Sequence, residues 1–303
     1  MVESGLARMK GVWAALPIPW QGEHVDQAMV RELVHRYADA GLHGAYTAGT
    51  DGELHVLDDR AFDELTEALA AASAETGLAV QAGCTASHTS AVVRRARFAS
   101  DAGIRVVQVA LPGWIPLSDD EVVDFFGGLA QEVPEVGVVH YNIATSGRFL
   151  LGAQYRRLVE ACPTLVGTKT TGGDVSQLID IVDGAPDLAH FVVDHQIVPG
   201  AQFGAVGFYS FHANLVPRVS LALWEACERR DWDEAVRLRL AMEVFLREWR
   251  AARPKVSSPA LAKIATSAGL LPGFPLGVRA PYRSGSDEDV AALVELVGKH
   301  FGG

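Results

Sequence analysis

The chain has 303 residues, of which 49% are hydrophobic and 21% are charged, an ordinary composition for a globular protein with a full core. Its formal net charge of −11 argues against nucleic acid as a partner, because proteins that bind polyanions usually present a basic face.

The cysteines and the N-terminus give expectations about the compartment. Cys84, Cys162 and Cys227 are widely spaced and include no CxxC pair, so neither a disulfide framework nor a zinc site is expected. The N-terminus lacks a basic stretch followed by an apolar one, and no apolar run approaches the roughly 20 residues of a membrane helix. We therefore expect a soluble, cytoplasmic protein with no membrane partner.

Short runs rich in Val, Ala and Tyr recur from one end of the chain to the other. Continuous apolar runs of this length are typical of strands that are buried on both faces. The predicted strands are 12–20, 43–49, 78–83, 106–112, 137–142, 165–171, 191–195 and 205–210.

Segments of helical period separate these strands. They include 26–40, 59–74, 90–102, 119–131 and 154–161. Asp58 precedes the second helix, and Ser118 with Glu121 three residues later predicts a capping box at the start of the fourth. Glycines at positions 41, 77 and 103 are typical helix end signals.

The alternation of strands and helices indicates parallel β/α units, and eight such units close naturally into a (β/α)8 TIM barrel. An open doubly wound sheet is the alternative, disfavoured because no GxGxxG motif follows the first strand. Further helices are predicted at 221–226, 233–250, 260–268 and 288–301. We expect the barrel to span 1–225, with a C-terminal helical extension over 226–303 packed on it.

Lys169 is the first candidate for chemistry. The C-terminal ends of barrel strands face the active site, and Lys169 lies near the end of the sixth predicted strand. Burial lowers the pKa of a lysine and leaves a neutral amine that can attack a carbonyl carbon. The alternative is a lysine that reaches solvent or pairs with Asp194, and the residue pattern alone leaves both interpretations open.

Tyr141 and a glycine-containing loop are further candidates. Tyr141 ends the fifth predicted strand, where a phenol can transfer protons, although a core aromatic is the alternative. The loop after the second strand contains Gly49, Thr50 and Asp51, whose hydroxyl and backbone N–H groups suit a carboxylate or phosphate. Its alternative interpretation is a tight turn with Asp51 as a local acceptor.

Three histidines near strand ends do not indicate a metal site. His140, His195 and His212 show no HExxH motif or comparable ligand spacing, so no metal is assigned.

Seven short motifs follow one another in a fixed order between Gly11 and Pro217. They are GVWAALPIPW at 11–20, GTDGE at 49–53, QAG at 81–83, ALPGW at 110–114, YNI at 141–143, VGTK at 166–169, and GAVGFYS at 204–210 followed by Ala213 and Asn214. In this order they resemble the motifs of the dihydrodipicolinate synthase and N-acetylneuraminate lyase family, including its GTTGE loop, its YNVP motif and its GIK-type strand.

The resemblance implies roles for the candidate residues. Lys169 would be the nucleophile that forms a Schiff base with pyruvate or a related 2-keto acid, Tyr141 the acid and base, and Thr50 a hydroxyl that orients Tyr141. The protonated imine would act as the electron sink, so no metal or organic cofactor is required. The substrate-binding residues implied are Gly49, Asp51, Trp114, Ser146 and Tyr209.

Three positions depart from the family pattern. Ser146 occupies the place of a carboxylate-binding arginine, for which Arg148 is the nearby substitute. Asp51 would repel a substrate carboxylate by roughly 4 kcal/mol at 4 Å under an effective dielectric constant near 20, so it turns away, is protonated, or meets a hydroxyl or amine. Trp114 replaces a tyrosine that reaches into a neighbouring subunit's site, and suggests an aromatic wall for a bulkier substrate.

The leading functional hypothesis is a Schiff-base lyase, an aldolase or dehydratase, acting on pyruvate or a related, sugar-acid-derived 2-keto acid. Dihydrodipicolinate synthase activity ranks below it because of Ser146. A further alternative is a ligand-binding or regulatory barrel that has lost catalysis, which the intact Lys169, Tyr141 and Thr50 disfavour. The resemblance also implies a homo-oligomer, either a dimer or a tetramer.

Overall fold

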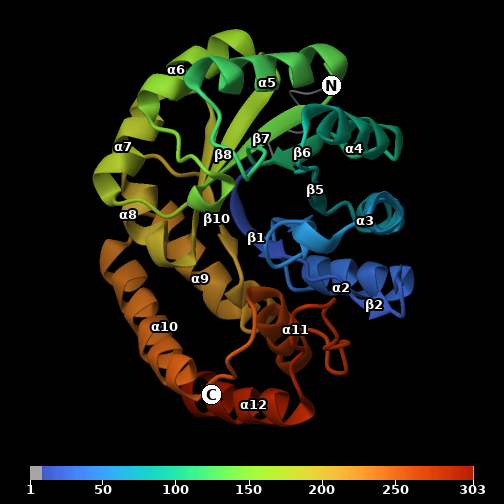
Figure 1. Cartoon of the computed structure of the whole chain (residues 1–303). Helices are drawn as coiled ribbons and strands as arrows, with labels where there is room; N and C mark the ends of the chain where they lie inside the picture. Colours follow the sequence, from blue (N-terminus) through green and yellow to red (C-terminus); the bar gives the residue numbers. More distant parts are fainter. Residues whose placement is uncertain (1–8, 303) are drawn as a thin grey trace. The chain divides into compact units, whose positions relative to one another are not determined.

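A computed structural model describes residues 9–302 of the chain. Eight parallel strands form a closed barrel in the order β1-β10-β9-β8-β7-β6-β5-β4 (Figure 1). These strands are β1 (Gly11–Ala15), β4 (Gly44–Thr47), β5 (Ala79–Gly83), β6 (Val106–Val109), β7 (Gly137–Ile143), β8 (Leu165–Thr171), β9 (Ala189–Val193) and β10 (Gly207–Ser210). The predicted barrel is confirmed, and the open sheet is wrong.

Helices alternate with these strands as expected. They are α2 (Gln27–Asp39), α3 (Asp59–Thr76), α4 (Thr89–Asp101), α5 (Asp119–Glu132), α6 (Gly152–Ala161), α7 (Val175–Gly184), α8 (Ile197–Gln202) and α9 (Pro217–Glu228). Short 3-10 turns follow four strands, namely η1 (Leu54–Val56), η2 (Ala144–Ser146), η3 (Asp194–Gln196) and η4 (His212–Asn214).

The predicted helix signals have their expected geometry. The Asp58 carboxylate accepts a hydrogen bond from the Ala61 N–H at 2.8 Å, and Ser118 and Glu121 form the capping box that begins α5. Gly77 ends α3 with a φ of 72°, a left-handed conformation that favours glycine.

The first strand is shorter than predicted. The sequence predicts a strand over 12–20, but β1 ends at Ala15, and Trp20 instead begins a small hairpin of β2 (Trp20–Gln21) and β3 (His24–Val25). Pro17 and Pro19 explain the difference, because proline has no N–H with which to continue a strand ladder.

The chain divides into two compact units. One contains Ala79–Tyr209 together with the segment up to Gly11, and the other contains Val12–Leu78 and Ser210–Gly303. The C-terminal helices therefore group with the first β/α units of the barrel. The predicted boundary after residue 225 falls within α9 and stays a prediction.

The C-terminal helices form an apolar core within the second unit. They are α10 (Trp232–Ala252), α11 (Ser258–Ala268) and α12 (Asp287–Phe301), which match the predicted helices closely (Figure 1). Phe245 and Trp249 of α10, Ile264 of α11 and Leu293 of α12 are buried together in this core. Within residues 9–302, none of the helices combines the length and apolar character that crossing a bilayer requires.

A buried ion pair joins the loop after β4 to α11. The Nζ of Lys263 lies 2.6 Å from Oε1 of Glu53, and the two side chains are 0% and 1% exposed. The Trp20 indole donates to the same carboxylate at 2.9 Å, and the backbone N–H of Arg279 donates to its other oxygen at 3.0 Å. Burial lowers the pKa of Lys263, while the Glu53 carboxylate opposes this shift.

Lys263→Met should destabilise the fold strongly, because it leaves the Glu53 carboxylate buried without its counter-ion. Breaking a buried pair costs about 3–5 kcal/mol, so the free energy of unfolding in urea should fall by that amount. Lys255→Met, at an exposed position before α11, is the matched control and should change stability by about 0.5 kcal/mol or less. Equal stability of the two variants would contradict the importance of the pair.

Candidate active site

The side chains of β7 alternate between the helices and the barrel interior. His140 faces outward, since its Nδ1 lies 2.8 Å from the Tyr155 hydroxyl of α6 and its ring contacts Phe126 of α5. Successive residues of a strand point to opposite faces. Tyr141 therefore faces the interior of the barrel.

The same alternation places Lys169. On β8, Thr168 bonds at 2.9 Å to Nδ1 of His190, whose Nε2 lies 2.8 Å from the carbonyl oxygen of Ala185 at the end of α7. Thr168 thus faces the helices, and Lys169 faces inward. Tyr141 and Lys169 are direct partners in the β7–β8 register.

The Lys169 nitrogen lies between two aromatic rings. Its Nζ is 4.0 Å from the centre of the Tyr141 ring and 4.8 Å from the centre of the Tyr209 ring. Lys169 is 2% exposed, which excludes the alternative of a lysine that reaches solvent. The structure therefore brings three of the predicted site residues together.

The Tyr209 hydroxyl is held by a hydrogen bond. The Tyr209 hydroxyl donates to Oε1 of Gln81 at 2.6 Å. Burial raises the pKa of Tyr209, and its hydrogen bonding with Gln81 and Gln108 offsets this only in part. The Tyr209 phenol therefore keeps its proton at neutral pH.

The loop after β4 contains a tight turn, which is one part of its alternative interpretation. Glu53 N–H donates to the Thr50 carbonyl at 3.2 Å, and Leu54 N–H donates to the Gly49 carbonyl at 3.1 Å. A Cβ on Gly52 would lie 2.5 Å from the backbone nitrogen of Ala48, so only glycine fits there. The Thr50 side chain is exposed at this turn, and its proposed role towards Tyr141 stays a prediction.

Asp51 has a partner in the C-terminal helices. Its Oδ1 accepts a hydrogen bond from the Ser258 hydroxyl at the start of α11, at 2.5 Å. Of the three alternatives for Asp51, this hydrogen bond favours the first, a carboxylate that turns away from the substrate.

Ser146 and Arg148 are held by groups of the protein itself. The Ser146 hydroxyl donates to the Ile143 carbonyl at 2.7 Å. The Arg148 guanidinium donates to the Leu117 carbonyl at 2.6 Å and pairs with the carboxylate of Asp119 at the start of α5. These contacts occupy the guanidinium and argue against Arg148 as the substitute for the family arginine.

Trp114 lies in the loop after β6 and is 99% exposed, with a φ of 100°. The neighbouring Ile115 is 73% exposed. A positive φ is uncommon for a residue other than glycine, so the backbone is strained at Trp114. Its predicted role as an aromatic wall for the substrate stays a prediction.

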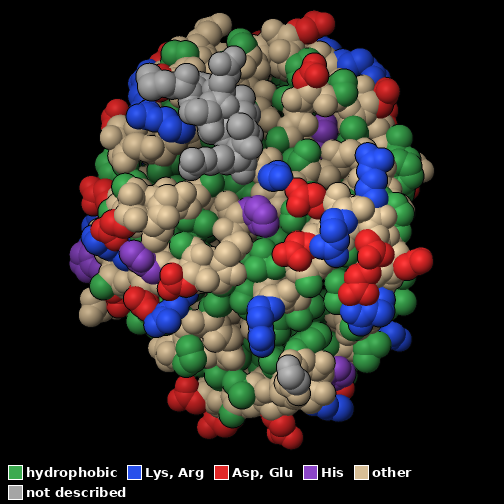
Figure 2. Space-filling view, turned by 180° about the vertical axis from the view of Figure 1, so that it is seen from behind, with side chains coloured by type: hydrophobic (Ala, Val, Ile, Leu, Met, Phe, Trp, Pro, Cys, Tyr) green, Lys and Arg blue, Asp and Glu red, His purple; other side chains and the backbone are tan. Residues whose placement is uncertain are grey.

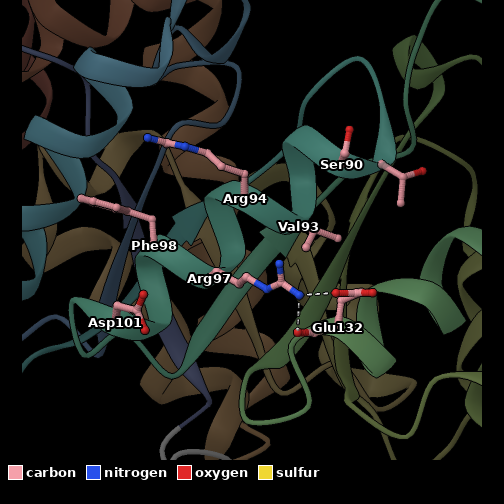
Figure 3. Close-up of a pocket in the computed structure, with 8 residues that line it drawn as sticks. Ser90, Val93, Arg94, Arg97, Phe98, Asp101 and Glu132 are labelled. Atoms are coloured by element: carbon pink, nitrogen blue, oxygen red, sulfur yellow. Dashed lines mark hydrogen bonds and ion pairs between the residues drawn. The ribbon is translucent and has the colours of Figure 1, made fainter.

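A separate groove of about 610 Å³ runs along the outer side of α4 (Figure 3). Arg97 pairs there with the Glu132 carboxylate, and the Arg94 guanidinium lies 5.4 Å from the centre of the Phe98 ring. Figure 2 shows the same kind of mixed surface, with basic and acidic side chains interspersed. The groove offers no buried nucleophile, so the barrel interior remains the candidate active site.

Two glutamines near the site were not among the predicted site residues. Gln81 and Gln108 are 0% and 1% exposed. The Gln81 Oε1 accepts hydrogen bonds from the Tyr209 hydroxyl and from Nε2 of Gln108. A polar residue within a continuous apolar strand was the signal available in the sequence, as in LAVQAG and VVQVA.

A buried lysine beside a phenol inside a parallel barrel is the kind of site found in aldolases that form a Schiff base. Residues 8–298 match the model of the dihydrodipicolinate synthetase family, and the chain belongs to that family. It is therefore an enzyme of the lyase class within the Schiff-base class I aldolase superfamily.

Individual relatives agree with this assignment. A DapA-like lyase of Halobacterium salinarum is 30% identical over 275 residues, which cover 89% of this chain and 87% of the relative. An N-acetylneuraminate lyase of Rhizobium meliloti is 28% identical over 96% of this chain and 95% of its own length. The sialic acid aldolase of Ruminococcus gnavus has the same fold, with a TM-score of 0.86 at 21% identity over 97% of this chain and 98% of its own.

The burial of the His140 imidazole can be tested by the pH dependence of stability. Burial lowers the pKa of His140 to about 3, compared with about 6.5 in an unfolded chain. Below about pH 6.5 the unfolded chain takes up a proton that the folded chain does not, so this group lowers stability by about 1.4 kcal/mol per pH unit. His140→Gln should remove that part of the slope when urea unfolding is measured between pH 7 and pH 5.

Tyr155→Phe is the matched control for His140→Gln. It removes the hydroxyl that contacts Nδ1 but keeps the titrating imidazole, so it should lower stability at every pH and retain the slope. An unchanged slope in His140→Gln would show that this imidazole is not shielded from protonation.

Proposed function

We propose that the protein forms a Schiff base between Lys169 and a 2-keto acid, pyruvate or a larger sugar-acid-derived one, and makes or breaks a bond at the adjacent carbon. The observation that carries this proposal is the Lys169 nitrogen, 2% exposed and 4.0 Å from the Tyr141 ring. A buried amine of this kind is suited to attack a carbonyl carbon.

The chemistry follows from the imine. The neutral amine adds to the keto carbon, and loss of water from the carbinolamine gives the imine. In its protonated form the imine accepts the electron pair of a bond broken at the adjacent carbon, which gives an enamine. Protonation of the enamine and hydrolysis return the amine, so the reaction assigns no role to a metal or an organic cofactor.

Tyr141 is the proposed proton carrier because the centre of its ring lies 4.0 Å from the Lys169 nitrogen, closer than the 4.8 Å of the Tyr209 ring. Thr50 is proposed to orient the Tyr141 hydroxyl. We further propose that Gly49, Asp51, Trp114, Ser146 and Tyr209 surround the substrate.

The substrate class has two candidates. The rhizobial relative is named N-acetylneuraminate lyase, which supports a sugar-acid substrate. A relative from Methanosphaerula palustris is named 4-hydroxy-tetrahydrodipicolinate synthase, which favours that reaction as the second candidate. It ranks lower because Ser146 replaces the arginine and Arg148 is already paired with Asp119.

Two further proposals accompany this function. A barrel that binds a ligand without turnover is the remaining alternative, and turnover of any 2-keto acid would dismiss it. We also propose a homo-oligomer, a dimer or a tetramer, in which another copy covers the exposed Trp114 and Ile115; sedimentation measures this directly.

Borohydride trapping tests the Schiff base. Incubation with pyruvate and then borohydride should add the mass of a reduced pyruvyl group to Lys169, located by peptide mass spectrometry. Lys169→Ala should give no adduct, whereas Lys255→Met should label as the wild type does. If Lys169 stays unmodified with pyruvate and with larger sugar-derived 2-keto acids at saturating concentration, the proposal is wrong.

Tyr141→Phe tests the proton carrier. The variant keeps the ring and loses the hydroxyl, so kcat should fall by about 10²–10⁴-fold, the usual contribution of general acid–base catalysis. Tyr155→Phe is the control. It removes a buried hydroxyl of α6 that packs against the outer side of β7, so the variant should keep its turnover. A kcat for Tyr141→Phe close to that of Tyr155→Phe would assign the proton transfer to another group.

A further inference from the structure

Three polar side chains occupy the barrel interior beside Lys169. Gln108 faces inward because its neighbour Val109 pairs with the outward His140. Gln81 shares the inward face of β5 with Gly83, the register partner of Gln108. Tyr209 shares the inward face of β10 with Gly207, because Gly207 pairs with Phe191 and Phe191 pairs with Lys169.

Polar side chains are unusual at such positions. The interior of a parallel barrel is mostly filled by branched apolar residues, and a buried amide is costly unless it is hydrogen-bonded. Within residues 9–302, Nε2 of Gln81 and Oε1 of Gln108 have no hydrogen-bond partner. The two amides therefore carry a free-energy cost, which points to a role other than stability.

The amides converge on one phenol. The Tyr209 hydroxyl donates to Oε1 of Gln81 at 2.6 Å, and Nε2 of Gln108 donates to the same oxygen at 3.5 Å. Since β10 and β5 are not neighbours in the barrel, the bond between Tyr209 and Gln81 crosses the interior. It fixes the far end of the Tyr209 side chain.

The fixed ring presents its face to the reactive nitrogen. The centre of the Tyr209 ring lies 4.8 Å from Nζ of Lys169, and the Phe191 ring packs against it with 5.0 Å between the ring centres. The face of an aromatic ring carries negative charge density and attracts a cation. A protonated imine carries its positive charge on this same nitrogen.

We propose that Tyr209 is an aromatic platform that stabilises the protonated imine at Lys169, and that Gln81 and Gln108 are the positioning residues that hold its ring in place. The inference rests on the proposed Schiff-base function. It divides the work between two tyrosines, since Tyr141 moves protons and Tyr209 stabilises charge. Tyr141 of β7 and Tyr209 of β10 each place a titratable phenol beside the nitrogen. Phe191 of β9 has no titratable group.

The first experiment measures imine formation by borohydride trapping as a function of pyruvate concentration between pH 6 and pH 9. Tyr209→Leu removes the ring and should weaken imine formation roughly tenfold, as expected for a buried cation–π contact. Because the protonated imine loses a stabilising contact, the decline of imine formation at alkaline pH should move to lower pH by about one unit. Tyr209→Phe keeps the ring but loses the hydroxyl that Gln81 holds, so it should weaken imine formation by about threefold, less than Tyr209→Leu.

A double-mutant cycle tests the positioning residues. Gln81→Leu frees the Tyr209 hydroxyl and should weaken imine formation by about threefold in the wild type. In the Tyr209→Phe background the same substitution should have little further effect, because the hydroxyl that Gln81 holds is already gone. Additive effects of the two substitutions would overturn the positioning role.

Tyr155→Leu is the control for general loss of packing. It removes an equally buried tyrosine from the outer side of the barrel, so it should lower thermal stability and leave imine formation unchanged. The platform role is wrong if imine formation shifts equally in Tyr155→Leu. It is also wrong if Tyr209→Leu folds and its imine formation keeps the wild-type pH dependence. If Tyr209→Leu does not fold, the Gln81 cycle decides; if the wild type itself traps no 2-keto acid, it is the proposed function that fails.

Discussion

The site depends on a lysine nitrogen held inside a ring of parallel strands. Two hydrogen bonds on the outer side of the barrel fix which face of β7 and β8 meets the helices. One joins His140 and Tyr155, and the other joins Thr168 and His190. Because side chains alternate along a strand, a shift of one residue would turn Lys169 out of the interior. The register between the two strands then sets Tyr141 beside Lys169, and every chemical role proposed for the site follows from that pairing.

Much of this arrangement could be predicted from the sequence. The strand ends located Lys169 and Tyr141, because apolar runs mark buried parallel strands and the alternation of elements marks the barrel. The end of β1 was missed, since an apolar run continues through Pro17 and Pro19 although a strand ladder does not. The roles of Thr50 and Trp114 were predicted from resemblance and remain predictions.

Partners far apart in the chain could not be predicted. Gln81 and Tyr209 are 128 residues apart, and periodicity indicates the face of a strand but not the group that a side chain meets across the barrel. Asp51 is a similar case. Three alternatives were open for its carboxylate, and the partner found for it, Ser258, lies in the C-terminal helices. The same helices supply Lys263 to Glu53, so the turn that carries Thr50 is built from both ends of its unit.

The two buried lysines show how surroundings separate a structural role from a chemical one. Lys263 is paired with a carboxylate at 2.6 Å, and such a pair keeps its proton because breaking it would leave a buried charge alone. The Lys169 nitrogen lies 4.0 Å from the centre of the Tyr141 ring and 4.8 Å from the centre of the Tyr209 ring. A ring face attracts a cation, so both rings suit positive charge on this nitrogen. In the proposed reaction this charge arises when the nitrogen becomes a protonated imine.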